Sequence, residues 1–437
     1  MHLRSLNNAT VLIESNNSNL LIDPWIVGKI YKGSWSPVVK VKNLNFLNKV
    51  TDVFISHIHQ DHWDEETLKL LNRDVKIFIP NMIVNNVIKK NLINLGFKNI
   101  EFKNFDEIWN VGQNLELKII PPMNTFGQKY EDYIEGYESD YAAVDTSLFV
   151  KDKLTNTAHL FLCDNTPYDQ NILLKHVQKN LTSLWYPFNS YAQDYPICYE
   201  LSSEEKITIL DEIHNKRKET IKSALRLLKP KYYFPHSADF ILNGPNRFEF
   251  EKYVKKEFMQ RELVAKNYNF KEIQDLNCIS SYLNISDELE FLNEDKIFIT
   301  RKKWEVEPMM SINQLEEFQS DIFDDLPKVV KKSFSLMIER TNKYKIDMTD
   351  AKNWVLSLKI NQNYFNFSFA LNKLIDTKDI KNTNKIIIIR LTEKQLSALL
   401  NREFHWNNAM GGFHLNIKRV PNEFCRCLYQ AINFLHL

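Results

Sequence analysis

The chain has 437 residues, of which 44% are hydrophobic and 25% are charged, and its formal net charge at pH 7 is +1. A chain of this length is expected to form two domains with sizeable cores. The balanced charge shows no basic stripe, so nucleic acid is not expected as a partner. Residues 1–5 lack the features of a signal peptide and no apolar run reaches membrane-spanning length, so we expect a cytoplasmic protein without a membrane partner.

The cysteines predict neither disulfides nor an iron-sulfur cluster. Cys163, Cys198, Cys278, Cys425 and Cys427 form an odd, dispersed set, which is not typical of a disulfide framework or a structural zinc site. Cys425 and Cys427 form a C-x-C motif without a second pair, and we interpret them as packing residues. The chain also lacks the paired C-x-H and C-x-x-H motifs of a Rieske centre, so no Rieske cluster is expected in it.

The first predicted elements are a β-hairpin and a third strand. Residues 10–14 and 19–23 are β-type runs separated by the turn-forming sequence S-N-N-S. Residues 52–56 form a further apolar run. After residue 63, the acidic sequence D-E-E-T at 64–67 predicts the first turn of a helix.

Between that third strand and this helix the chain reads H-I-H-Q-D-H, which supplies His57, His59, Asp61 and His62. In a loop at a strand end, these side chains can divide between two metal ions a few ångströms apart. Neutral imidazole with carboxylate suits zinc, iron or manganese, and two metals prepare a hydroxide or polarise a substrate oxygen. The alternative is an ordinary surface turn, which is the weaker interpretation because the whole chain has only 11 histidines.

Short strands and helices continue to alternate through the rest of the first half. Strands are predicted at 75–79, 99–105, 115–120, 146–150, 159–163, 184–187 and 231–234, and helices at 81–95 and 206–228. This order predicts an α/β fold over residues 1–245, in which two sheets lie face to face with helices outside, an αββα sandwich.

The character of the sequence changes in the second half. Residues 246–289 are charged and helix-prone, and we interpret them as a helical connection. Strands are then predicted at 296–300, 354–360, 365–371 and 385–390, with a helix at 393–400. They predict a second, smaller α+β domain over residues 290–437. This domain faintly resembles a sterol-carrier-like fold, and no lipid ligand is assigned to it.

The string H-x-H-x-D-H is similar to the signature of the metallo-β-lactamase superfamily, and its strand-loop-helix context fits. The resemblance implies a catalytic domain with two divalent metal ions, Fe, Zn or Mn. It implies that Asp23 supports the histidine loop from behind the ligands. It also implies a bridging ligand at Asp164 and a last histidine at His236, each at a strand end. The alternatives are a helix cap for Asp164 and a core histidine for His236.

The third histidine of the first metal is missing. Between Ile120 and Asp164 the only histidine is His159, which lies at the wrong end of its strand. Asp145, directly before a strand, is our first candidate for this position and Asp140 the second. A carboxylate there would shift the preference from zinc toward iron or manganese. The alternative is a weak or empty metal position.

With a carboxylate in place of the third histidine, the chain resembles the catalytic part of CMP-N-acetylneuraminate hydroxylase and its bacterial relatives. Looser strings support the likeness, among them Y-P-I-C-Y at 195–199 and R-V-P-N at 419–422. The resemblance implies an iron-dependent oxidation or hydroxylation of a small molecule, a sugar or sugar nucleotide, as in carbohydrate biosynthesis. Because the chain has no Rieske domain of its own, electrons would come from an external reductase or ferredoxin.

A hydrolase remains the alternative. His236 and the prevalence of hydrolases in the superfamily favour a zinc or manganese enzyme that cleaves a phosphodiester, lactone or amide. Asp61 or Asp164 would then be the catalytic residue that orients the attacking hydroxide and moves protons. A scaffold that keeps these ligands only for stability is the third, non-catalytic alternative.

Two further segments are candidates for substrate contact. Tyr191, Gln193, Asp194 and Tyr195 lie between a strand and a helix on the expected active-site face, where they would bind sugar hydroxyls. Ordinary loop residues are an equally good interpretation. The sequence W-N-N at 406–408 would line the site if the second domain folds back over it, or else it packs at a domain interface.

Overall fold

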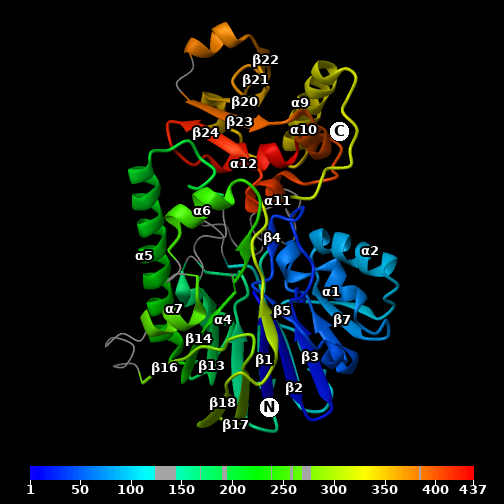
Figure 1. Cartoon of the computed structure of the whole chain (residues 1–437), viewed down its shortest axis with the longest axis vertical. Coiled ribbons are helices and arrows are strands. Elements are labelled where there is room, and N and C mark those ends of the chain that lie inside the picture. Colours follow the sequence, from blue (N-terminus) through cyan, green and yellow to red (C-terminus); the bar gives the residue numbers. More distant parts are fainter. Residues whose placement is uncertain are drawn as a thin grey trace.

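The arrangement of sheets divides the molecule into a larger lower part and a smaller upper part (Figure 1). The computed structural model describes residues 1–123, 144–167, 169–188, 194–237, 239–255, 259–267, 277–382 and 385–437. Two extended sheets stand in the lower part, near the amino terminus, and a third sheet with its own helices lies above them near the carboxyl terminus.

The first sheet contains the predicted hairpin. Its strands lie in the order β18 (Lys296–Thr300), β17 (Glu288–Asn293), β1 (His2–Asn7), β2 (Thr10–Ser15), β3 (Ser18–Ile22), β6 (Asp52–Phe54), β7 (Lys76–Pro80) and β8 (Ile100–Lys103). β2 and β3 are antiparallel, with Leu12 opposite Leu21. β6 pairs parallel to β3, with Phe54 opposite Ile22. Because parallel strands end at the same edge, Asp23 and the histidine loop meet there.

The second sheet brings further strand ends to one edge. Its strands lie in the order β16 (Ile279–Ser280), β14 (Tyr232–His236), β13 (Ser183–Pro187), β12 (Thr157–Phe161), β11 (Ser147–Asp152), β10 (Leu115–Ile120) and β9 (Ile108–Val111). β12, β13 and β14 are parallel, with Phe161 opposite Trp185 and Pro187 opposite His236. β11 is antiparallel to β12, with Leu148 opposite Phe161, and so begins where β12 ends.

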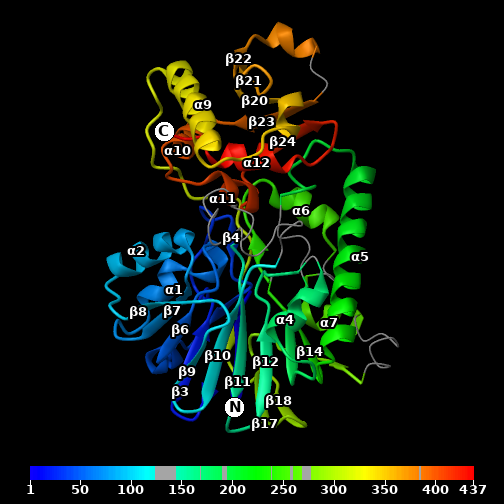
Figure 2. The same ribbon diagram turned by 180° about the vertical axis from the view of Figure 1, so that it is seen from behind.

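Three apolar layers make this part of the molecule an αββα sandwich. Inward-facing residues of both sheets, such as Phe54 and Phe161, form the core between them. Helices cover the outer face of each sheet through separate apolar clusters (Figure 2). These helices are α1 (Glu65–Lys69) and α2 (Asn86–Asn94) on the first sheet and α5 (Ser203–Leu228) on the second. The predicted α/β fold class is confirmed.

The helix after the histidine loop begins where the sequence predicts. Asp64 is the N-cap of α1, and its carboxylate accepts hydrogen bonds from the backbone N–H groups of Glu66 and Thr67. The N–H of Gly28 also donates to Asp64 Oδ2, at 2.9 Å. A Cβ at position 28 would lie 2.1 Å from that carboxylate, so only glycine permits this approach. The contact fixes the loop after β3 against the start of α1.

The strand at 296–300 forms as predicted but belongs to the first sheet rather than to a C-terminal domain. β17 pairs with β1, and β18 pairs with β17, so both extend the sheet that holds the hairpin. β1 would otherwise be an unpaired edge, which these strands cover. The connection at 246–289 likewise contributes β16, which pairs with β14, besides the helices α6 (Arg247–Tyr253) and α7 (Arg261–Asn267).

The third sheet lies in the C-terminal part of the chain and has the order β22 (Lys373–Ile375), β21 (Asn363–Ser368), β20 (Trp354–Ile360), β23 (Lys385–Leu391) and β24 (Asn416–Val420). Its helices are α9 (Leu326–Lys343), α10 (Glu393–Leu400), α11 (Trp406–Gly411) and α12 (Arg426–Asn433). The core cluster of this sheet includes Trp25, Tyr31 and Trp35 from the N-terminal part. One continuous apolar cluster therefore joins the two parts.

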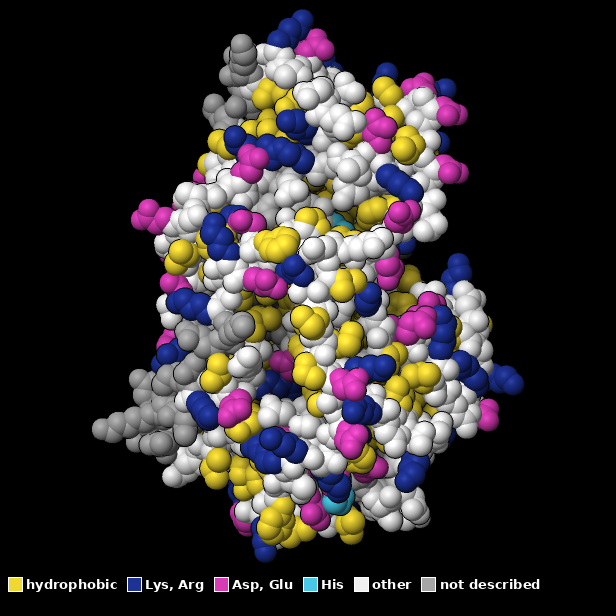
Figure 3. Space-filling view, in the orientation of Figure 1, with side chains coloured by type: hydrophobic (Ala, Val, Ile, Leu, Met, Phe, Trp, Pro, Cys, Tyr) yellow, Lys and Arg dark blue, Asp and Glu magenta, His cyan; other side chains and the backbone are white. Residues whose placement is uncertain are grey.

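Two further observations concern the charges on the surface and the character of the helices. On the face seen in Figure 3, basic and acidic side chains are interspersed. Within the described part of the chain, none of the helices combines the length and apolar character needed to cross a bilayer.

Candidate metal centre

The histidine loop lies at the sheet edge where β6 ends, and residues of the second sheet join it there. Asp145 precedes β11, Asp164 follows β12, and His236 is the last residue of β14. Since these three strand ends share one edge, the topology alone brings the predicted residues together.

One group of candidate ligand atoms consists of His57, His59 and Asp145. His57 Nε2 lies 2.9 Å from His59 Nδ1 and 3.3 Å from Asp145 Oδ1. His59 Nδ1 lies 3.7 Å from the same oxygen. The His57 side chain is fully buried, whereas 26% of the His59 side chain is exposed, so this group opens toward solvent on the His59 side. Asp140, the second candidate for this position, lies outside the described residues.

The second group consists of His57, His62 and Asp164. His62 Nε2 lies 3.3 Å from Asp164 Oδ2 and 3.4 Å from Asp61 Oδ2. Within each group the candidate ligand atoms lie within 4.8 Å of one another. Because both groups include His57, they adjoin, as a pair of metal ions a few ångströms apart requires.

His236 reaches the edge of this arrangement but joins neither group within the described part of the chain. Its ring packs against Trp185 and Phe161, and among the described residues neither of its buried nitrogens has a hydrogen-bond partner. The hydroxyl of the next residue, Ser237, donates to Asp164 Oδ1 at 2.9 Å. The role of His236 as a metal ligand stays a prediction.

Asp23 lies behind His62, on the side away from Asp164. Its carboxylate accepts hydrogen bonds from the Ser56 N–H at 2.7 Å and the Ser56 hydroxyl at 2.8 Å. Asp23 Oδ2 also lies 2.7 Å from His62 Nδ1. This contact fixes the ring so that Nε2 faces Asp164, which is the supporting position that the sequence resemblance implies.

Two residues that the sequence did not reveal hold Asp61. The Tyr31 hydroxyl donates to Asp61 Oδ1 at 2.8 Å, and the Asn8 side-chain amide donates to Oδ2 at 2.9 Å. Tyr31 and Asn8 both have positive φ, 50° and 42°, in loops after β3 and between β1 and β2. Neither position stands in a motif, so only the fold shows that they reach the site.

The charges around His62 favour a cation at this centre. Burial alone would lower the pKa of His62, but Asp61, Asp23 and Asp164 together raise it well above its ordinary value. Burial, with His62 and His59 nearby, holds the pKa of His57 well below its ordinary value, so His57 is a neutral imidazole with a free electron pair. His62 Nε2 is buried and faces the carboxylates of Asp164 and Asp61, at 3.3 and 3.4 Å. A divalent metal ion fits these donors, because it supplies the positive charge that the carboxylates favour.

The C-terminal part of the chain touches the first group through α11. The side-chain amide of Asn407 hydrogen-bonds His59 at Nε2, with 3.1 Å between the two nitrogens. An amide carries both a donor and an acceptor and so can serve either tautomer of the ring. Ion pairing of Lys32 with Glu403, at 2.7 Å, joins the same two parts of the chain nearby. Asn407 thus contacts the histidine loop, as expected if the second domain folds back over it.

We expect Asn407→Ala to weaken metal binding about tenfold, as removal of a group that orients a ligand typically does. Asn408→Ala is the matched control, since it changes the neighbouring asparagine of the same helix and leaves the contact of Asn407 with His59 in place. Competition with a chromogenic chelator measures the affinity, and urea unfolding should show both variants within about 0.5 kcal/mol of the wild type. Equal affinities of the two variants would assign Asn407 to interface packing alone.

The predicted sugar-binding segment is described only in part. Tyr191 and Gln193 lie outside the described residues. The Tyr195 hydroxyl accepts a hydrogen bond from the Asn422 side chain at 3.0 Å, and the Arg419 guanidinium lies 5.0 Å from the centre of the Tyr195 ring. Tyr195 therefore faces β24 of the third sheet, and its role in substrate binding stays a prediction.

Because the carboxyl group of Asp194, next to Tyr195, is buried, we expect the stability of the fold to depend on pH. Burial raises the pKa of Asp194 to about 7 from 3.8. The unfolded chain thus releases a proton that the folded chain retains, so stability falls as pH rises from about 4 to about 7, by up to about 4 kcal/mol. Asp194→Asn should remove this loss and be the more stable protein at about pH 8. Urea unfolding across this range tests it, with the exposed Asp324→Asn as control. Parallel stability curves for wild type and Asp194→Asn would refute the assignment.

Comparison with known sequences points to one family for the N-terminal part. Residues 2–123 match the family model described as "Beta-lactamase superfamily domain". A putative Rieske 2Fe-2S iron-sulfur protein of Mycolicibacterium smegmatis is 36% identical over 84 residues, which are 18% of this chain and 16% of that protein. The UPF0173 protein YddR of Bacillus subtilis is 28% identical over 92 residues, 18% of this chain and 36% of YddR. Each match thus covers only a small part of the curated relative.

Comparison with solved structures gives partial superpositions. CmlA, a diiron beta-hydroxylase from Streptomyces venezuelae, superposes with a TM-score of 0.45 and 15% identity, covering 69% of this chain and 54% of CmlA. Igni18, a novel metallo hydrolase from Ignicoccus hospitalis, gives a TM-score of 0.39 and 14% identity, covering 69% of this chain and 98% of Igni18. These similarities leave the reaction open, and the likeness to CMP-N-acetylneuraminate hydroxylase stays a prediction.

Proposed function

We propose that the chain is an enzyme of the metallo-β-lactamase fold with two adjoining metal positions at the histidine loop, because residues 2–123 match the superfamily model and the candidate ligands form two adjoining groups. We propose further that the metals are iron and that the reaction is the oxidation or hydroxylation of a small molecule. The observation that carries this proposal is the position of Asp145 beside His57 and His59.

The group of His57, His59 and Asp145 combines two histidines with one carboxylate, and His57 offers a single ligand atom, so it can serve only one of the two metal ions. Two imidazoles and one carboxylate with open positions are typical of non-haem iron(II) enzymes that use oxygen. Bound iron would supply the oxygen chemistry. A third imidazole in place of Asp145 would make the first group the three-histidine set of many zinc enzymes.

The chain's own residues hold and orient the centre. Tyr31 and Asn8 each donate a hydrogen bond to Asp61, which fixes the carboxylate beside His62. The partly exposed side chains of His59 and Asp164 mark the side from which a substrate would approach. In this proposal Asp61 accepts a proton or orients a substrate hydroxyl.

The substrate and the electron donor rest on the sequence resemblance. A sugar or sugar nucleotide is our proposed substrate class, with an external reductase or ferredoxin as the source of electrons.

His236 supports a second candidate, a hydrolase. The His236 imidazole is buried, and among the residues that the structure describes neither of its nitrogens has a hydrogen-bond partner. The next residue, Ser237, donates to Asp164, so the His236 ring would complete the second group if it turned toward that carboxylate. Zinc or manganese with such a set would cleave a phosphodiester, lactone or amide.

Anaerobic purification followed by metal analysis separates these candidates. The oxidative proposal expects about two iron ions per chain and oxygen consumption upon reduction by a chemical donor. Zinc in both positions together with no oxygen consumption would remove the oxidative proposal and favour the hydrolase.

A further inference from the structure

A pair of cysteines lies at the start of α12, in the part of the chain that carries the third sheet. Cys425 is the N-cap residue of α12, and Cys427 is the second residue of the helix. Their Sγ atoms are 3.6 Å apart and both are free thiols. The two sulfurs are thus in contact without a bond between them, and the proposed metal chemistry uses neither.

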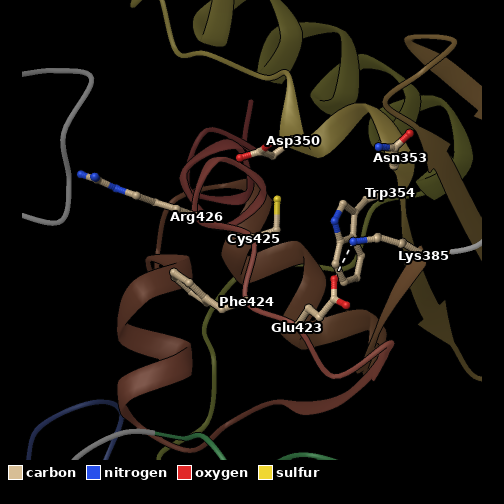
Figure 4. Close-up of a pocket in the computed structure, with 8 residues that line it drawn as sticks. All are labelled: Asp350, Asn353, Trp354, Lys385, Glu423, Phe424, Cys425 and Arg426. Atoms are coloured by element: carbon tan, nitrogen blue, oxygen red, sulfur yellow. Dashed lines mark hydrogen bonds and ion pairs between the residues drawn. The ribbon is translucent and has the colours of Figure 1, made fainter. Parts of the chain in front are cut away.

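Cys425 also lines a pocket of about 380 Å³ (Figure 4). The pocket lies among α12, β20 and β23, and its lining includes two basic residues, Lys385 and Arg426, and two acidic residues, Asp350 and Glu423. Lys385 forms an ion pair with Glu423, at 2.5 Å, at the pocket rim. A molecule of liquid water occupies about 30 Å³, so the pocket has room for a small oxidant beside Cys425.

We propose that Cys425 and Cys427 form a redox-active dithiol that peroxide oxidises to a disulfide within the chain, with Cys425 as the attacking thiol. The sulfur contact and the pocket carry this proposal, because one sulfur must be reachable from outside and the other must be adjacent to it. The two Sγ atoms would move from 3.6 Å to the bonded distance of about 2.05 Å.

The chemistry balances with hydrogen peroxide as the only co-reactant. The Cys425 thiolate attacks one peroxide oxygen, the O–O bond breaks, and the departing hydroxide takes a proton to become water. The Cys427 sulfur then attacks the Cys425 sulfenic acid, the S–O bond breaks, and a second water leaves with the Cys427 proton. Two thiols lose two electrons in total, and one peroxide becomes two waters.

The electrostatics distinguish Cys425 from the other cysteines. Contact with the Cys427 thiol lowers the pKa of Cys425 to about 7, so a large fraction is thiolate at neutral pH. The same contact raises the pKa of Cys427, which suits the second, resolving thiol. Burial raises the pKa of Cys278 to about 12 and that of Cys163 and Cys198 well above the ordinary value.

Thiol counting after peroxide treatment tests the proposal on the full chain. The reduced protein has five free thiols, and we expect two of them to be lost on oxidation and regained with dithiothreitol. Trypsin cleaves after Arg426, between the two cysteines, so the oxidised protein should yield two tryptic peptides joined by the disulfide. Retention of all five thiols until the protein unfolds would overturn the proposal, as would loss of other thiols at the same rate.

Single variants assign the two roles. Cys427→Ser should accumulate a sulfenic acid at Cys425 that dimedone captures. In Cys425→Ser, Cys427 should stay reduced, because we expect peroxide to oxidise it at least about tenfold more slowly than it oxidises the wild-type pair. Cys278→Ser is the matched control and should still lose two thiols. If Cys427 is oxidised equally fast in Cys425→Ser, Cys425 is not the attacking thiol and the proposal is wrong. If a variant fails to fold, the tryptic peptide map of the wild-type protein still tests whether the disulfide forms.

Discussion

Asp145→Ala should reduce the bound iron from about two ions per chain to about one and abolish oxygen consumption. Asp145 Oδ1 lies 3.3 Å from His57 Nε2 and 3.7 Å from His59 Nδ1, so its removal leaves the first metal with two protein ligands. The expected loss of affinity exceeds the roughly 10–100-fold typical of a residue that only supports a ligand. Metal analysis by mass spectrometry after equilibrium dialysis measures it.

Two variants at the same position serve as controls. Asp145→Asn keeps the shape of the side chain but removes its charge, and it should resemble the alanine variant in metal content. Asp145→His restores a third imidazole and should retain two metals while preferring zinc to iron. If Asp145→Ala keeps both irons and full oxygen consumption, another residue completes the first metal position and the proposed ligand set is wrong.

Asp23→Ala should destabilise the metal-free protein by about 3–5 kcal/mol, because it removes the buried partner of His62 and the acceptor for Ser56. Asp23 is completely buried, so water does not replace the lost carboxylate. Asp23 also has a φ of 45°, which aspartate tolerates better than alanine. Urea unfolding monitored by tryptophan fluorescence measures the change.

Asp23→Asn is the matched control for this experiment. The amide oxygen can still accept from Ser56, so we expect a smaller loss, about 1–3 kcal/mol, together with weaker metal binding through a misoriented His62. An Asp23→Ala protein within about 0.5 kcal/mol of the wild type would contradict the support role of Asp23.

The sequence predicted the parts of the site that lie in contiguous motifs or at strand ends. Residues 57–62 could be recognised because all four candidate ligands occur within six positions. Asp145 and Asp164 could be placed because each adjoins an apolar run, and the antiparallel pairing of β11 with β12 brings their ends together. Local sequence therefore carried most of the candidate centre.

Residues that reach the site through tertiary structure could not be found in this way. Tyr31 and Asn8 contact Asp61 from loops whose positive φ values bear no motif. Asn407 lies 348 positions from His59, so its contact could be predicted only on the condition that the C-terminal part covers the loop. The sequence assigns the strand at 296–300 to the C-terminal domain, whereas it joins the first sheet through β17, which pairs with β1, and nothing local specifies so distant a partner.

Anomalous diffraction at the iron edge, from crystals of protein loaded with iron under anaerobic conditions, tests the binuclear centre most directly. The account predicts two peaks a few ångströms apart, one among His57, His59 and Asp145 and the other beside His62 and Asp164. A single peak, or peaks away from the histidine loop, would contradict it.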